Sequence, residues 1–134
     1  MPWNIVKENW KTIRNLSRED EITFIRSRAF FDDEYWCTMI TDNWTRDKAT
    51  RVQVPMGNFQ LEMLDVLHSK RNAVIIVPRN HSKTSTISKA GATKRLCYQL
   101  EREILLVSSE GLGESVIGDI REEFESNYLL TELL

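Results

Sequence analysis

Cysteine, proline and glycine are all scarce in this chain. Two cysteines, three prolines and five glycines in 134 residues exclude a disulfide-stapled scaffold and a collagen-like or low-complexity protein. No run of 18 apolar residues occurs, which excludes a membrane-spanning helix. Residues 1–11 are polar where a secretory signal would need an apolar core. We therefore expect a reducing, cytoplasmic location and no membrane partner.

A large net charge is also missing, although charge is concentrated locally. The chain carries 18 basic and 20 acidic residues, a formal net charge of −2. Residues 68–102 hold eight basic residues and one acidic residue, whereas residues 103–134 hold one basic and eight acidic residues. The basic stretch indicates an anionic ligand, phosphate or nucleic acid, although an exposed basic helix face would give the same pattern.

The first third of the chain is predicted to be helical. Ser17 and Asp20 have capping-box spacing ahead of apolar residues at helical intervals, and Asp32 and Asp33 precede a second such stretch. Aromatic residues are dense here, and we interpret them as part of a packed helical layer. A base-stacking surface is the alternative, which the acidic balance of residues 1–67 disfavours. These aromatic residues are Trp3, Trp10, Phe30, Phe31, Tyr35, Trp36 and Trp44.

The second half alternates between apolar runs and helical patterns. Residues 73–77 (AVIIV) and 104–109 (ILLVSS) are predicted as buried strands. Helices are predicted over 59–70 with Asn58 as N-cap, over about 15 residues after Thr84, and over an amphipathic stretch after Gly113. This order predicts an α/β fold in which a βαβα unit with parallel strands follows the N-terminal helices. Two strands are too few for a complete parallel sheet.

The loop between the first predicted strand and the helix after it contains most of the candidate functional residues. In a phosphate-binding loop, backbone amides at a helix N-terminus hold the phosphates, a lysine reaches the β and γ phosphates, and the next hydroxyl binds Mg²⁺. Lys83 and Thr84 follow an apolar strand in this way, but Val77 and Ser82 replace the usual glycines. Arg79 adds a cation suited to phosphate oxygens. An ordinary surface loop remains the alternative.

A glutamine upstream of this loop matches the chemistry of a nucleotide base. Gln60 lies 23 residues before Lys83, and its amide can both donate to and accept from the edge of adenine. Four stretches then stand in order: FQLEML, NAVIIVPRNHSKTST, ILLVSS and IGDIREEFESNYLL. Together they resemble the N-terminal ATPase region of the large terminase subunit, the DNA-packaging motor of tailed phages and related viruses. The resemblance spans residues 55–130, somewhat over half of the chain.

The resemblance implies a partial P-loop NTPase (RecA-like) fold. A helical region would cover residues 1–54, and the front part of an ATPase domain would cover residues 55–134. ATP and Mg²⁺ would be the cofactors, and double-stranded DNA and other terminase or portal subunits would be the partners. A viral protein of this kind would work in the host cell cytoplasm.

The same resemblance implies a role for each residue of the site. Arg79 and Lys83 would be the catalytic residues that act on phosphate charge. Thr84 would bind Mg²⁺, and Gln60 would contact adenine. The nucleotide would be held by Gln60, Arg79, Asn80, His81, Ser82, Lys83 and Thr84. Asn80 and Ser82 depart from the family pattern, which commonly has glycine at these places.

The acidic residues of a complete ATPase are missing. A nucleotide-hydrolysing motor needs a strand-end aspartate for Mg²⁺ and a carboxylate that positions water. No apolar run ending in such a pair follows Lys83, and the nuclease carboxylates of the family are absent too. We therefore expect the chain to contribute part of an ATP site without turning over ATP alone. An uncovered sheet edge would also favour self-association.

Two other functions remain open from the sequence. A helicase-like P-loop ATPase fragment would also pair an upstream glutamine with a phosphate loop. A non-enzymatic nucleic-acid-binding module would instead use the basic stretch to contact phosphate backbone. Its contact residues would be Lys89, Lys94, Arg95 and Arg102.

Other chemically suggestive residues are interpreted as structural. His68 and His81 stand without neighbouring ligands, and Cys37 and Cys97 lack metal-binding spacing, so we expect buried thiols. Acidic residues after Gly113 include neighbours on one helix face, but a solvated face explains them better than a metal site. The acidic residues are Glu114, Asp119, Glu122, Glu123 and Glu125.

Overall fold

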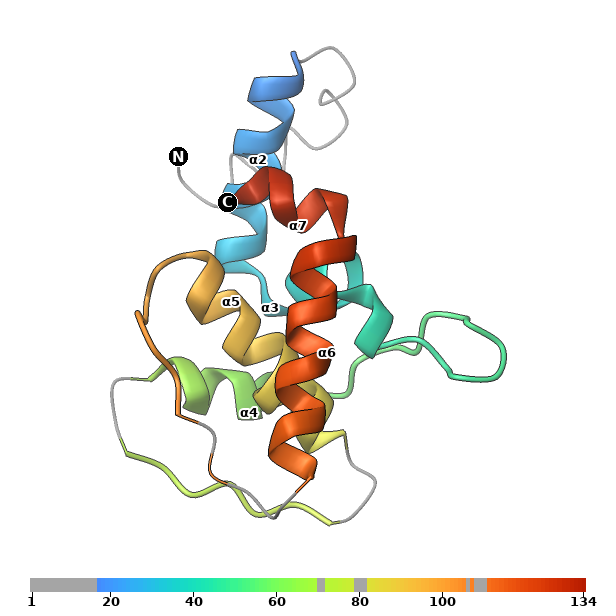
Figure 1. Cartoon of the computed structure of the whole chain (residues 1–134), viewed down its shortest axis with the longest axis vertical. Coiled ribbons are helices and arrows are strands. Elements are labelled where there is room, and N and C mark those ends of the chain that lie inside the picture. The colour runs from blue at the N-terminus through green and yellow to red at the C-terminus, as the bar shows by residue number, and fades with distance from the viewer. Residues whose placement is uncertain (1–16, 70–71, 79–81, 106, 108–110) are drawn as a thin grey trace.

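The described part of the chain forms helices joined by open segments (Figure 1). The computed structural model describes residues 17–69, 72–78, 82–105, 107 and 111–134. Within these residues, η2 and η4 are π-helical and η3 is a 3-10 turn. The elements are α2 (Arg18–Phe31), α3 (Asp33–Tyr35), η2 (Trp36–Ile40), η3 (Asp42–Trp44), α4 (Asn58–His68), η4 (Thr84–Gly91), α5 (Ala92–Cys97), α6 (Leu112–Ser126) and α7 (Tyr128–Leu133).

Helices α2 and α3 begin next to N-cap residues that can be recognised in the sequence. The Ser17 hydroxyl accepts a hydrogen bond from the Asp20 amide at 3.2 Å, and α2 begins at the next residue, as predicted. Asp32 caps α3 by accepting from the Tyr35 amide at 3.1 Å. Helix α4 begins at Asn58, so the predicted N-cap is wrong by one residue: Gly57 takes that position.

The core is built around Trp36. Its indole is fully buried, and its Nε1–H donates to the Ala90 carbonyl at 2.9 Å, which ties η2 to the end of η4. The ring of Tyr98 lies 5.7 Å from the indole, and its hydroxyl donates to the Arg26 carbonyl at 2.6 Å. Buried residues from both halves of the chain share this core, including Leu64 and Leu130. The predicted helical packing layer is confirmed at Tyr35 and Trp36, whereas Phe30 and Phe31 are exposed. Trp3 and Trp10 lie outside the described residues.

The C-terminal elements close onto α2 and η2. Asn127 caps α7 by accepting from the Leu130 amide at 3.1 Å, and its Nδ2 donates to the Ile40 carbonyl at 2.7 Å. The same amide group donates to the Glu123 carboxylate at 2.7 Å. The Arg26 guanidinium donates to the Leu133 carbonyl at 2.9 Å. Asn127 therefore has a structural role, because its hydrogen bonds fix the turn from α6 into α7 over the core.

The predicted α/β fold with parallel strands is wrong for the described residues. They contain no strand, and their one β-bridge joins Arg46 to Gln53. Residues 73–77 run as an open segment, as do the described residues of the second predicted strand, 104–105 and 107. Parallel sheets need both faces covered, whereas Val74, Ile76 and Leu105 are at least 87% exposed. Apolar composition predicted the strands, but nothing in the described chain covers them.

The predicted buried thiols are confirmed. Cys37 and Cys97 are both buried and unpaired, and burial raises the pKa of each thiol, to about 12 for Cys37. No helix in the described ranges is both long and apolar enough to span a bilayer.

Candidate phosphate site

The structure describes four of the seven predicted site residues. Gln60, Ser82, Lys83 and Thr84 are described, whereas Arg79, Asn80 and His81 lie outside the described residues. Gln60 lies in α4, Thr84 is the first residue of η4, and Ser82 and Lys83 directly precede it.

Ser82 adopts the backbone conformation that glycine normally supplies. Its φ is +58°, in the left-handed region, and its carbonyl accepts the first helical hydrogen bond from the Thr86 amide at 2.9 Å. Most L-residues avoid this region because Cβ crowds the backbone. The sequence places Ser82 where the second glycine of a phosphate loop would stand, and the observed turn explains why a glycine would suit that position.

Gln60 contacts the helix that follows the loop. Its Nε2 donates to the Thr86 hydroxyl at 3.4 Å, and its Oε1 accepts from the Gly57 amide at 2.8 Å. Gln60 therefore lies close to the helix that follows the loop, since Thr86 lies two residues after Thr84. These two hydrogen bonds already occupy the side-chain amide of Gln60. An adenine base could therefore bind this amide only by displacing them.

Lys83 is the basic residue best placed to meet a phosphate. It is exposed at the residue preceding η4, and it forms no ion pair with any described residue. The amides of residues 83–85 precede the first internal hydrogen bond of this helix, so they carry the positive end of its dipole. Thr84 is half-buried beside it.

Other cations of the basic stretch are held by carboxylates. The ammonium of Lys89 lies 2.6 Å from Asp119, and that of Lys94 lies 2.7 Å from Asp33. The guanidinium of Arg95 lies 2.7 Å from Glu101. Of the four residues suggested for nucleic-acid binding, only Arg102 is exposed without an ion pair in the described structure.

Sequence reasoning missed a charged cluster formed by Asp33, His68, Lys94 and Arg95. The Asp33 carboxylate accepts from Lys94 at 2.7 Å and contacts Nε2 of His68 at 3.1 Å. Arg95 lies 3.2 Å from Nδ1 of His68. Because a guanidinium only donates, Nδ1 must accept, which leaves Nε2–H to donate to Asp33. Asp33, His68 and the neighbouring pair Lys94 and Arg95 are far apart in sequence, so no local pattern could have joined them.

The pKa of Asp33 depends on two opposing effects, burial and the contacts with His68 and Lys94. Burial by itself would raise the pKa of the carboxyl group, but the hydrogen bond from His68 and the charge and hydrogen bond of Lys94 lower it more. The pKa therefore lies below its ordinary value of 3.8. Lys94 is almost fully buried with this carboxylate, so it serves stability and is not available to a ligand.

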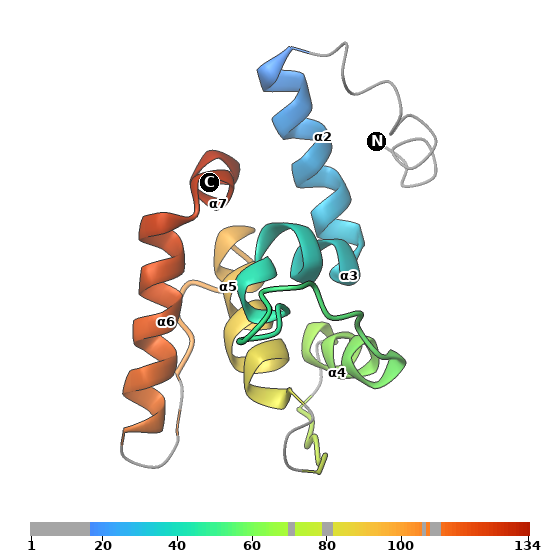
Figure 2. The same cartoon turned by 90° about the vertical axis from the view of Figure 1, so that its right-hand side faces the viewer.

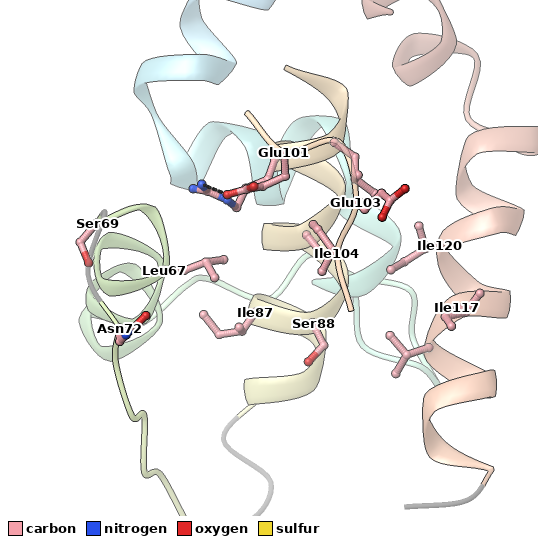
Figure 3. A pocket seen from close by; sticks show the side chains of 14 residues that line it. Leu67, Ser69, Asn72, Ile87, Ser88, Glu101, Glu103, Ile104, Ile117 and Ile120 are labelled. Atoms are coloured by element: carbon pink, nitrogen blue, oxygen red, sulfur yellow. Dashed lines mark hydrogen bonds and ion pairs between the residues drawn. The ribbon is translucent and has the colours of Figure 1, made fainter. Parts of the chain in front are cut away.

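A large apolar cavity lies apart from the predicted site. Its volume is about 860 Å³, and neither Gln60, Lys83 nor Thr84 lines it. Figure 3 shows Leu67 of α4 on one side, Ile87 of η4 in the middle and Ile117 of α6 on the other. The ion pair of Arg95 and Glu101 also lines this cavity. Its apolar walls do not suit a triphosphate.

No cluster of metal ligands occurs within the described ranges. No group of three or more histidine, cysteine, aspartate or glutamate side chains is placed to hold an ion there. The Glu123 carboxylate instead accepts from the side-chain amides of Asn43 and Asn127. Thr84 would have to bind Mg²⁺ together with oxygen atoms of the nucleotide.

Comparisons with known protein families, with characterised proteins and with solved structures find no match to this chain.

Proposed function

We propose that this chain binds the phosphates of ATP at the start of η4, as part of a terminase-like DNA-packaging ATPase. The observation that carries the proposal is the exposed Lys83, which stands at a helix start directly after a residue in the left-handed conformation. Backbone amides and a lysine at such a turn are suited to anionic oxygens. The contact of Gln60 with Thr86 supports a base-binding side chain near the same helix.

Each residue of the proposed site would make a different contact with the nucleotide. The ammonium of Lys83 would neutralise phosphate charge, and the amides of residues 83–85 would donate to phosphate oxygens. Arg79 would add a second cation by virtue of its place in the sequence. Mg²⁺, when bound with the nucleotide, would be neutralising charge on the phosphates, and the Thr84 hydroxyl would be its protein ligand. The chain would bind ATP without turning it over by itself.

The nucleic-acid-binding alternative is less well supported. Counterion release requires cations that are free to meet phosphate backbone, and Lys89, Lys94 and Arg95 already contact carboxylates. DNA, other terminase subunits and portal subunits enter the proposal through the resemblance alone.

Replacing Lys83 with alanine tests the phosphate site. We expect the affinity for ATP with Mg²⁺ to fall by about tenfold or more, because a hydrogen bond to a charged group contributes about 1.5–3 kcal/mol. The measurement is calorimetric or fluorescence titration of the full chain with ATP.

Arg102→Ala is the matched control for this experiment. Arg102 is also exposed and forms no ion pair with a described residue, so its loss removes one positive charge without touching η4. Its ATP affinity should stay close to that of the unmodified chain. Equal affinity in the Lys83→Ala protein, or an equal loss in both variants, would contradict the assignment.

A further inference from the structure

The large cavity beside η4 has walls from elements on both sides of this helix. Figure 2 shows η4 and α5 between α6 and α4. Leu67 lines the cavity from α4, Ile87 from η4 and Ile117 from α6. Ile104 adds an apolar side chain from the segment between α5 and α6. The volume of about 860 Å³ lies within the roughly 300–1,000 Å³ typical of small-molecule sites.

Contacts between the helices hold these walls in place. The Lys89 ammonium lies 2.6 Å from the Asp119 carboxylate, which ties η4 to α6. On the other side, a Cβ at Gly91 would clash with the Leu67 side chain, so the glycine allows η4 to pack closely against α4. These contacts fix the distance between the walls, and binding of a small molecule therefore requires little rearrangement of the helices.

The charges that line the cavity leave one carboxylate unbalanced. The charged lining residues are Arg95, Glu101 and Glu103. Arg95 and Glu101 lie 2.7 Å apart and neutralise each other. Glu103 forms no ion pair with any described residue, and Figure 3 shows its side chain extending toward α6, near Ile120. The cavity therefore combines apolar walls with one negative charge that no described cation balances.

We propose that this cavity binds a small apolar molecule that carries one positive charge, such as a hydrophobic amine. Ile104 and Ile117 are 42% and 50% exposed, so they offer apolar surface that the body of the ligand covers. Burial of that surface supplies most of the affinity. The ammonium group of the ligand meets the Glu103 carboxylate, which selects a cation over a neutral or anionic molecule of the same shape. The cavity is separate from the proposed ATP site.

Three probes with the same pyrene ring system test the charge preference: pyrenemethylamine, pyrenemethanol and pyrenecarboxylate. Pyrene fluorescence changes when the ring leaves water, so titration of the full chain measures the affinity for each probe. We expect the amine to bind about three- to fivefold more tightly than the alcohol, and the carboxylate to bind most weakly. The advantage of the amine should shrink as salt screens Glu103.

Two substitutions separate the carboxylate from the apolar wall. Glu103→Gln keeps the side-chain shape and should remove the preference for the amine, while the alcohol binds as before. Ile117→Ser should weaken the binding of all three probes by about threefold or more. Glu114→Gln and Leu112→Ser are matched controls on α6 outside the cavity lining, and Leu112 is 48% exposed against 50% for Ile117. Both controls should bind the probes as the unmodified chain does.

The helical circular dichroism of each variant should match that of the parent, because the substituted side chains are exposed. Equal affinity for the amine and the alcohol, or an unchanged preference in Glu103→Gln, would overturn the proposal. Failure of every probe to bind would do the same. So would a dimer in sedimentation experiments whose formation excludes the probes, because a second copy of the chain would then be the occupant.

Discussion

Replacing Lys94 with methionine is expected to lower the free energy of unfolding by about 3 kcal/mol or more. The methionine keeps most of the side-chain volume but leaves the Asp33 carboxylate without the ammonium that contacts it at 2.7 Å. Lys94 is only 4% exposed in its side chain and Asp33 only 17%, so water cannot readily replace the lost partner. Urea unfolding followed by circular dichroism measures the change.

The same variant should change the response of stability to acid. The pKa of Asp33 is lower in the folded protein than its ordinary value of 3.8, so its contribution is fully present above about pH 5 and is lost as the pH falls through the folded pKa. Without Lys94, burial of the carboxyl group is opposed mainly by His68, and the folded pKa rises. The loss of stability between neutral pH and about pH 3 should therefore be smaller in Lys94→Met.

Lys48→Met is the matched control for this result. Lys48 is exposed, and it forms no ion pair with any described residue. Its replacement should change the free energy of unfolding by about 0.5 kcal/mol or less and leave the acid response unaltered. Equal stability of Lys94→Met and Lys48→Met would show that the Asp33–Lys94 contact does not form in solution.

Replacing Trp36 with alanine should cost about 3–5 kcal/mol of unfolding free energy. The indole is 0% exposed and contacts both η4, through the Ala90 carbonyl, and the ring of Tyr98. Its removal leaves a cavity where η2 meets the helix that follows the loop. Thermal and urea unfolding should both show the loss, and a marginally stable chain would unfold altogether.

Two further variants separate packing from hydrogen bonding at this position. Trp36→Phe keeps an aromatic ring but removes the donor to Ala90, so it should cost less than Trp36→Ala. Phe31→Ala removes an aromatic ring that is 57% exposed and should cost least. A Phe31→Ala loss as large as that of Trp36→Ala would contradict the placement of the core.

Local sequence patterns predicted the helices well and the sheet wrongly. The caps at Ser17 and Asp32 act within three residues, so short-range spacing was enough to locate them. Burial of residues 73–77 depends on partners elsewhere in the chain, and apolar composition alone does not reveal whether such partners exist. Val74 and Ile76 are exposed because no described element lies over them.

The local structure around the candidate site was predictable in part for the same reason. The positions of Ser82, Lys83 and Thr84 at a turn into a helix follow from their order in the sequence. The approach of Gln60 to Thr86 is a contact between α4 and η4, which the upstream position of the glutamine suggested but could not establish. The pairing of Lys94 with Asp33 had no local signal, and it removes a cation that the charge pattern had counted as available for ligands.

The sequence by itself determined the small net charge, the two thiols too few for a disulfide scaffold, and the order of helix-forming and apolar segments. These properties depend on composition and on neighbours along the chain. Tertiary structure decided which basic residues are neutralised by carboxylates, that Ser82 occupies a left-handed turn, and that the apolar segments stay open. Burial and ion pairing depend on residues distant in sequence, and only the folded chain brings those residues into contact.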